Sequence, residues 1–154
     1  MVRNSGGWWA CPATSALCLR RTIFKTIGPI PQTELRYAAD GYLTYIVPLF
    51  GPVVGLAKCL TLYRFHGSNQ SQLTASERLA QYKEVLDSVN RRLTQLELQG
   101  LRLEDNMGYQ LSRYRAALPG HLRRDQLAWQ ALLFEGEPRV FQRLKNSVKI
   151  LVKG

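Results

Sequence analysis

The stretch that decides the fold prediction is residues 41–63, GYLTYIVPLFGPVVGLAKCLTLY. It carries a single charge, Lys58, in a chain whose formal net charge is +10. As one helix it would be about 34 Å long, which is enough to cross the hydrocarbon core of a bilayer. Tyr42 and Tyr45 lie near one end and Tyr63 at the other, as the aromatic belts of a membrane span do. The pattern predicts a membrane-embedded helix within residues 41–66.

Small residues and prolines inside this stretch predict a kinked helix that packs closely on another one. Gly51 and Gly55 form a G-x-x-x-G pair, whose missing side chains let a second helix approach. Pro48 and Pro52 each remove a backbone donor and kink a helix. Burial of the same segment inside protein is the alternative, because a bent apolar helix needs close neighbours in either setting. In a membrane, Lys58 and Arg64 would contact the headgroups.

The preceding residues, 1–40, form a basic N-terminal arm or an uncleaved import signal. The first 33 residues contain four basic residues, several Ser and Thr, and no Asp or Glu. Mitochondrial transit peptides have this composition. An ordered basic arm is the alternative interpretation of the same residues.

A long amphipathic helix is predicted over residues 74–118, after a polar hinge at 67–73. Thr74 and Glu77 have the spacing of a capping box at a helix start. Behind them, apolar side chains alternate steps of three and four, which is the seam of a coiled coil. This seam predicts the surface that binds a partner subunit: Leu79, Tyr82, Leu86, Val89, Leu93, Leu96, Leu103 and Met107. Packing on the chain's own C-terminal helices is the alternative.

Residues 119–154 are predicted to form a short helical hairpin with a basic tail. Phe141, Leu144, Val148 and Leu151 are spaced 3, 4 and 3 apart, on one face of a helix. The basic residues around that face would contact anionic lipid or RNA phosphate: Arg139, Arg143, Lys145, Lys149 and Lys153. A solvated basic face on a helix docked to protein is equally compatible with this pattern.

No motif of a catalytic site is visible in the sequence. The three cysteines, Cys11, Cys18 and Cys59, have neither metal-ligand spacing nor a disulfide framework. His66 and His121 are isolated from other ligand residues. We therefore expect no enzyme, no catalytic residue, no metal and no cofactor, with bound phospholipid as the one ligand that such a protein could hold.

Together these features predict an all-α, elongated protein with one kinked membrane-embedded helix, a long amphipathic helix and a helical hairpin. The predicted function is that of a non-catalytic accessory subunit of a mitochondrial inner-membrane complex, such as ATP synthase or a respiratory complex. It would anchor and brace neighbouring subunits as a single-pass protein. One alternative is an RNA-binding subunit of an organellar ribosome, in which the net charge of +10 neutralises phosphate. Another is a peripheral membrane adapter that uses the basic tail and has no membrane span.

Overall fold

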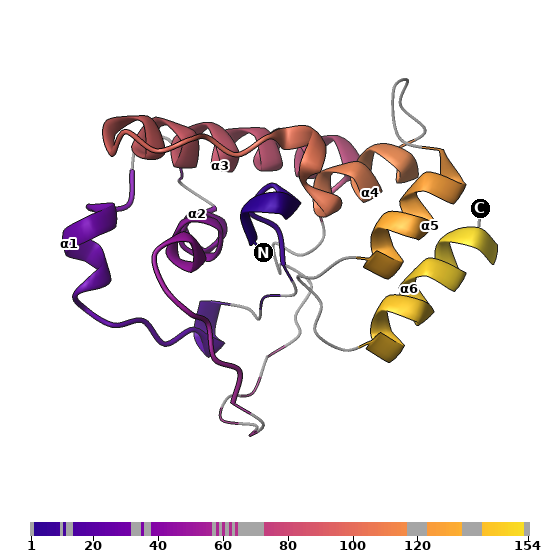
Figure 1. Ribbon diagram of the computed structural model, residues 1–154, viewed down its shortest axis with the longest axis horizontal. Helices are drawn as coiled ribbons and strands as arrows, with labels where there is room; N and C mark the ends of the chain where they lie inside the picture. The colour runs from indigo at the N-terminus through magenta and orange to yellow at the C-terminus, as the bar shows by residue number, and fades with distance from the viewer. Residues whose placement is uncertain are drawn as a thin grey trace.

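The computed structural model describes residues 2–9, 11, 14–31, 35, 38–56, 58, 60, 62, 64, 73–116, 123–133 and 140–152. Within these residues the chain forms helices joined by turns and loops, with no strand. The α-helices are α1 (Ile23–Ile27), α2 (Ala39–Ile46), α3 (Ala75–Gln95), α4 (Met107–Arg115), α5 (Arg124–Leu133) and α6 (Val140–Val152). Short 3-10 helices are η1 (Val2–Ser5), η2 (Thr14–Ala16), η3 (Val47–Leu49) and η5 (Leu103–Asp105). Figure 1 shows α1 and α2 beneath α3, with α4, α5 and α6 side by side at the other end of the molecule.

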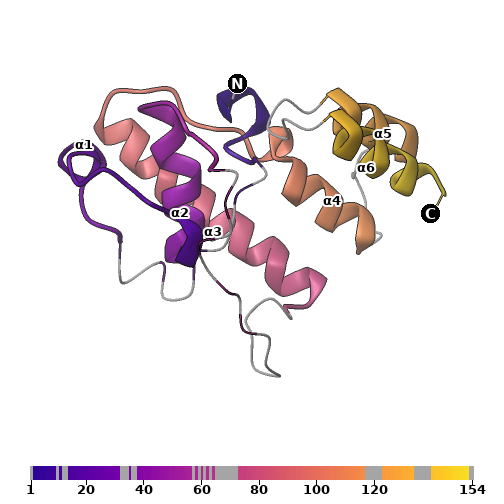
Figure 2. The same ribbon diagram turned by 90° about the horizontal axis from the view of Figure 1, so that it is seen from below.

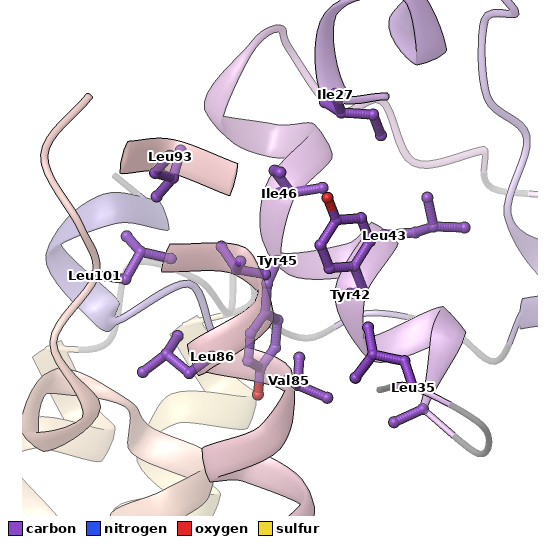
Figure 3. Close-up of a cluster of buried hydrophobic side chains, with 12 residues drawn as sticks. Ile27, Leu35, Tyr42, Leu43, Tyr45, Ile46, Val85, Leu86, Leu93 and Leu101 are labelled. Carbon is purple, nitrogen blue, oxygen red and sulfur yellow. The ribbon is translucent and has the colours of Figure 1, made fainter. Parts of the chain in front are cut away.

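The centre of the main hydrophobic core is α2. Five consecutive residues of this helix are buried, from Tyr42 to Ile46. A helix that is buried on every side must be enclosed by other segments. Here the enclosing side chains include Ile27 of α1 and Val85 and Leu93 of α3 (Figure 3). The apolar sequence of α2 therefore serves the interior of the protein.

The predicted membrane span is wrong. Within the described residues, no helix is both long enough and apolar enough to cross a bilayer. The apolar stretch divides into the end of α2, the 3-10 helix η3, and a non-helical run from Phe50 to Leu56. Pro48 lies in η3 and Pro52 in the non-helical run, where neither interrupts a helix. The predicted single-pass location in the mitochondrial inner membrane, which rested on this span, is not supported.

The predicted single helix over 74–118 is also wrong, because α3 ends at Gln95. Leu98 N–H donates to the Leu93 carbonyl (2.9 Å) and Glu97 N–H to the Thr94 carbonyl (3.0 Å). These two bonds are those of a Schellman motif, which satisfies the last carbonyls of a helix. Glu97 has φ 56° and occupies the left-handed position that usually holds glycine. The chain then returns through η5 and begins again as α4.

The start of α3, in contrast, lies where the sequence predicted it. The Thr74 hydroxyl accepts from Glu77 N–H (3.3 Å), and the Glu77 carboxylate accepts from Thr74 N–H (2.8 Å). Both halves of the capping box are present. The Thr74 side chain also holds the pKa of the Glu77 carboxyl below its usual value.

The predicted seam lies mainly inside the chain's own core. In α3 and α4 its buried members are Leu79, Leu86, Val89, Leu93 and Met107, while Tyr82, Leu96 and Leu103 are half-buried. α3 packs on α2 and α4 of the same chain, and not on a second long helix as in a coiled coil. A partner subunit for these residues stays a prediction that the structure of one chain does not test.

A second, smaller core joins the C-terminal helices to the rest of the molecule. It contains Met107 of α4 and Leu127 and Ala131 of α5. α5 and α6 form an antiparallel pair, in which Arg124 at the start of α5 donates to the Leu151 carbonyl near the end of α6 (3.1 Å). Figure 2 shows this pair beside α4 and far from α1. The indole of Trp8 packs against both cores and so connects them.

Candidate functional site

The candidate site begins with a carbonyl group that Pro48 leaves without a helical partner. In a continuous helix the Thr44 carbonyl would accept from the N–H of residue 48, which proline lacks. The Trp9 indole N–H donates to this carbonyl instead, at 2.7 Å. The proline thereby makes room for the N-terminal segment to cross over α2. No catalytic motif marks this arrangement; the spacing of Thr44 and Pro48 is its one trace in the sequence.

Asp40 and Thr44 lie one turn apart on α2 and therefore on the same face of that helix. Trp9 and Cys11 of the N-terminal segment lie over this face. We call these four residues the Asp40 cluster. The Asp40 carboxylate is exposed and accepts from Gly41 N–H (2.8 Å). The Thr44 hydroxyl, which is buried, donates to the Gly41 carbonyl (3.0 Å). The cluster thus combines an accessible carboxylate with an aromatic ring and a thiol.

Cys11, a titratable neighbour of Asp40, is a neutral thiol near pH 7. Desolvation by the surrounding protein raises the pKa of the Cys11 thiol, and the negative charge of Asp40 raises it further. A thiol of this kind is a poor nucleophile, because the thiolate is the reactive form. Burial likewise raises the pKa of the phenols of Tyr45 and Tyr82. The carboxyl group of Asp40 is therefore the accessible acidic group of this cluster.

Asn106 connects the N-terminal segment that carries Trp9 to the start of α4. Its side chain is fully buried, donates to the Gly6 carbonyl (3.0 Å) and accepts from Tyr109 N–H (2.9 Å) at the start of α4. Gly6 has φ 56°, and a Cβ there would lie 2.5 Å from the Arg102 carbonyl oxygen. Only glycine allows this approach of the two segments. The position of the cluster thus depends on contacts between residues that are far apart in the sequence.

The residues predicted to form a membrane contact do not form a site. Gly51 and Gly55 have no atom within 4 Å of an added Cβ, so none of the described helices packs on them. Lys58 and Arg64 are both exposed, and neither lies in a helix. No group of three or more potential metal ligands occurs in the described part of the chain.

The predicted basic tail is partly described. Lys145 and Lys149 are exposed on α6, and Arg143 is half-buried. Arg139 and Lys153 lie outside the described residues, as does almost all of the predicted hinge at 67–73.

Comparison with known proteins adds one partial similarity. No family model and no solved structure matches the chain. The chain resembles a glycosyltransferase over half its length. It is 33% identical over 76 residues, or 49% of the chain, to an uncharacterized glycosyltransferase of the cyanobacterium Nostoc sp. strain PCC 7120. The matched region is 24% of that protein, so the chain spans about a quarter of the length of the relative.

This similarity bears on the prediction that the chain is not an enzyme. A relative named as a glycosyltransferase points towards an enzyme, and nothing supports a non-enzyme. It carries no information on an accessory subunit of a membrane complex or on a ribosome.

Proposed function

We propose that the chain is a helical part of a glycosyltransferase. The observation that carries this proposal is the 33% identity over 76 residues with a protein of that name. The matched region is a quarter of the relative, so the chain would supply one portion of the machinery for sugar transfer. Substrate contacts are then expected at an accessible polar cluster on the helices.

The Asp40 cluster has the chemistry that such a portion requires. Transfer of a sugar to a hydroxyl group needs a base that takes the hydroxyl proton as the new bond forms. If the leaving group of the sugar donor is a phosphate, it departs as an anion. No second carboxylic acid is then needed to protonate it. We assign the base to Asp40, whose carboxylate is exposed and lies close to the Cys11 thiol. The indole of Trp9, which is bonded to the Thr44 carbonyl of the same helix, adds an aromatic ring to the cluster.

The test is binding of sugars to the purified chain by ligand-observed NMR. Sugar nucleotides are presented as donors and free mono- and disaccharides as acceptors. We expect at least one acceptor sugar to bind, and Asp40→Asn to weaken that binding about tenfold or more, because a hydrogen bond to a charged group is lost. Asp87→Asn is the matched control, since Asp87 is an exposed carboxylate on α3.

Two results would contradict the proposal at different levels. If no donor and no acceptor sugar binds, the chain does not supply part of a glycosyltransferase site. If a sugar binds with equal affinity to Asp40→Asn and to Asp87→Asn, Asp40 is not the base, and the sugar site lies elsewhere on the chain.

The predicted role as an accessory subunit of a larger complex stays a second proposal. It no longer includes a membrane span. Large apolar side chains are exposed outside the helices, where Leu62 is 98% and Val54 77% exposed. Exposed apolar side chains that cluster mark interaction surfaces. Co-purification of other subunits with the chain, lost on Val54→Ser with Leu62→Ser, would favour this role. No structural feature favours the ribosomal alternative, which stays a prediction.

A further inference from the structure

The apolar face of α6 points away from the molecule. Phe141, Leu144, Val148 and Leu151 share one helix face, and all four are exposed, Phe141 by 79%. Ser147 is the buried residue of this helix, on the side that meets α5. An isolated amphipathic helix in a folded domain normally turns its apolar face inward. α6 has the opposite orientation, with its more polar side against the protein.

The pair of helices α5 and α6 also carries exposed basic and aromatic side chains. Lys145 and Lys149 are exposed on α6, and the sequence has no acidic residue after Glu137. On α5, Trp129 is 63% and Leu133 68% exposed, one helical turn apart. The one acidic residue of α5, Asp125, is paired with Arg123 at 2.7 Å. Figure 1 shows α6 at the outer edge of the molecule, where a large flat surface can reach it.

These features select among the partners that could cover the face. A second copy of the chain would bring the same cations to the contact, where like charges repel each other. Nucleic acid could stack bases on the ring of Phe141, but it offers no apolar surface for the aliphatic side chains of Leu144, Val148 and Leu151. An anionic lipid surface satisfies both features, because acyl chains accept the apolar face and headgroups pair with the lysines.

We propose that α6, with Trp129 and Leu133 of α5, is an interfacial membrane anchor that lies in the plane of an anionic bilayer. The helix buries Phe141 and Val148 at the boundary between headgroups and acyl chains, while Lys145 and Lys149 contact the headgroup phosphates. The anchor lies on the membrane and does not cross it. This inference is independent of the proposed glycosyltransferase function, since it uses a different surface.

The test is sedimentation of the full chain with vesicles of phosphatidylcholine alone and of phosphatidylcholine mixed with phosphatidylglycerol. We expect binding to the mixed vesicles, reduced at high salt. Lys145→Gln with Lys149→Gln should weaken it by roughly fivefold for each charge removed. Phe141→Ser with Val148→Ser should weaken binding at least tenfold at every salt concentration, because burial of each large apolar side chain contributes strongly to partitioning.

Matched control variants make the same chemical changes elsewhere on the surface. Lys25→Gln with Lys83→Gln removes two exposed lysines from α1 and α3, and Val54→Ser with Leu62→Ser removes two exposed apolar side chains outside the helices. Both controls should bind vesicles as the unaltered chain does, and circular dichroism should show all variants folded. The anchor proposal is overturned if the unaltered chain binds no vesicle. It is also overturned if the controls lose as much binding as the hairpin variants, or if light scattering shows a dimer that Phe141→Ser with Val148→Ser dissociates.

Discussion

Single side chains in this protein replace backbone contacts that helices would otherwise make. The Trp9 indole takes the carbonyl that Pro48 cannot use, and the Asn90 side chain donates to and accepts from the backbone of Leu101 (2.9 and 2.7 Å). Asn106 does the same between Gly6 and the start of α4. Buried backbone groups need such partners because an unpaired one costs about 1–3 kcal/mol.

The bridging role of Asn106 predicts a large cost for its removal. We expect Asn106→Ala to lower the free energy of unfolding by roughly 2–3 kcal/mol, since one helix cap and one buried hydrogen bond are lost together. Urea denaturation measures this difference. Asn4→Ala is the control, because Asn4 is exposed and should change stability by about 0.5 kcal/mol or less. Equal stability of the two variants would show that Asn106 does not hold the N-terminal segment.

Among the helices, the end of α3 determines how the residues that follow it are arranged. A glycine marks most Schellman motifs, but the left-handed residue here is Glu97 and the nearest glycine is Gly100. The apolar periodicity continues across this point, so it predicts one helix where the structure has two. The hydrogen bonds between Asn90 and Leu101 hold the chain in a return path along α3, so the helix does not continue.

The left-handed position of Glu97 predicts an unusual stabilising substitution. Glu97→Gly should raise the free energy of unfolding by about 1 kcal/mol, because glycine adopts positive φ without steric cost. Gln95→Gly, in the last turn of α3, should lower it by about 1 kcal/mol. Thermal unfolding of both variants checks the pair. Destabilisation by both would mean that α3 does not end in this way.

At the scale of the whole molecule, two cores share one connecting side chain. The larger core surrounds α2 and the smaller one lies between α4 and α5, and Trp8 packs against both. A Cβ on Gly108 would lie 2.6 Å from the Trp8 indole nitrogen, so the ring is held closely against α4. Cooperative unfolding of the two cores therefore depends on this contact.

Removal of the connecting ring should uncouple the cores. We expect Trp8→Ala to cost roughly 2–3 kcal/mol, less than for a fully buried tryptophan, and to make α4–α6 exchange amide hydrogen before α2 and α3 do. Hydrogen exchange followed by mass spectrometry resolves the two regions. Trp129→Ala, at an exposed site, should leave both regions unchanged. Uniform exchange across the chain in Trp8→Ala would refute the coupling.

Local sequence patterns correctly predict those features whose partners are a few residues apart. Thr74 and Glu77 cap α3 because both groups belong to one helical turn, and the spacing from Phe141 to Leu151 defined an apolar helix face. Where the apolar surface packs depends instead on tertiary contacts. An uncharged apolar stretch such as residues 41–57 suits a bilayer and a protein interior equally, and the chain encloses α2 with segments from α1 and α3. The outward face of α6 and the position of Asp40 beside Trp9 likewise depend on contacts between distant residues, which no local pattern contains.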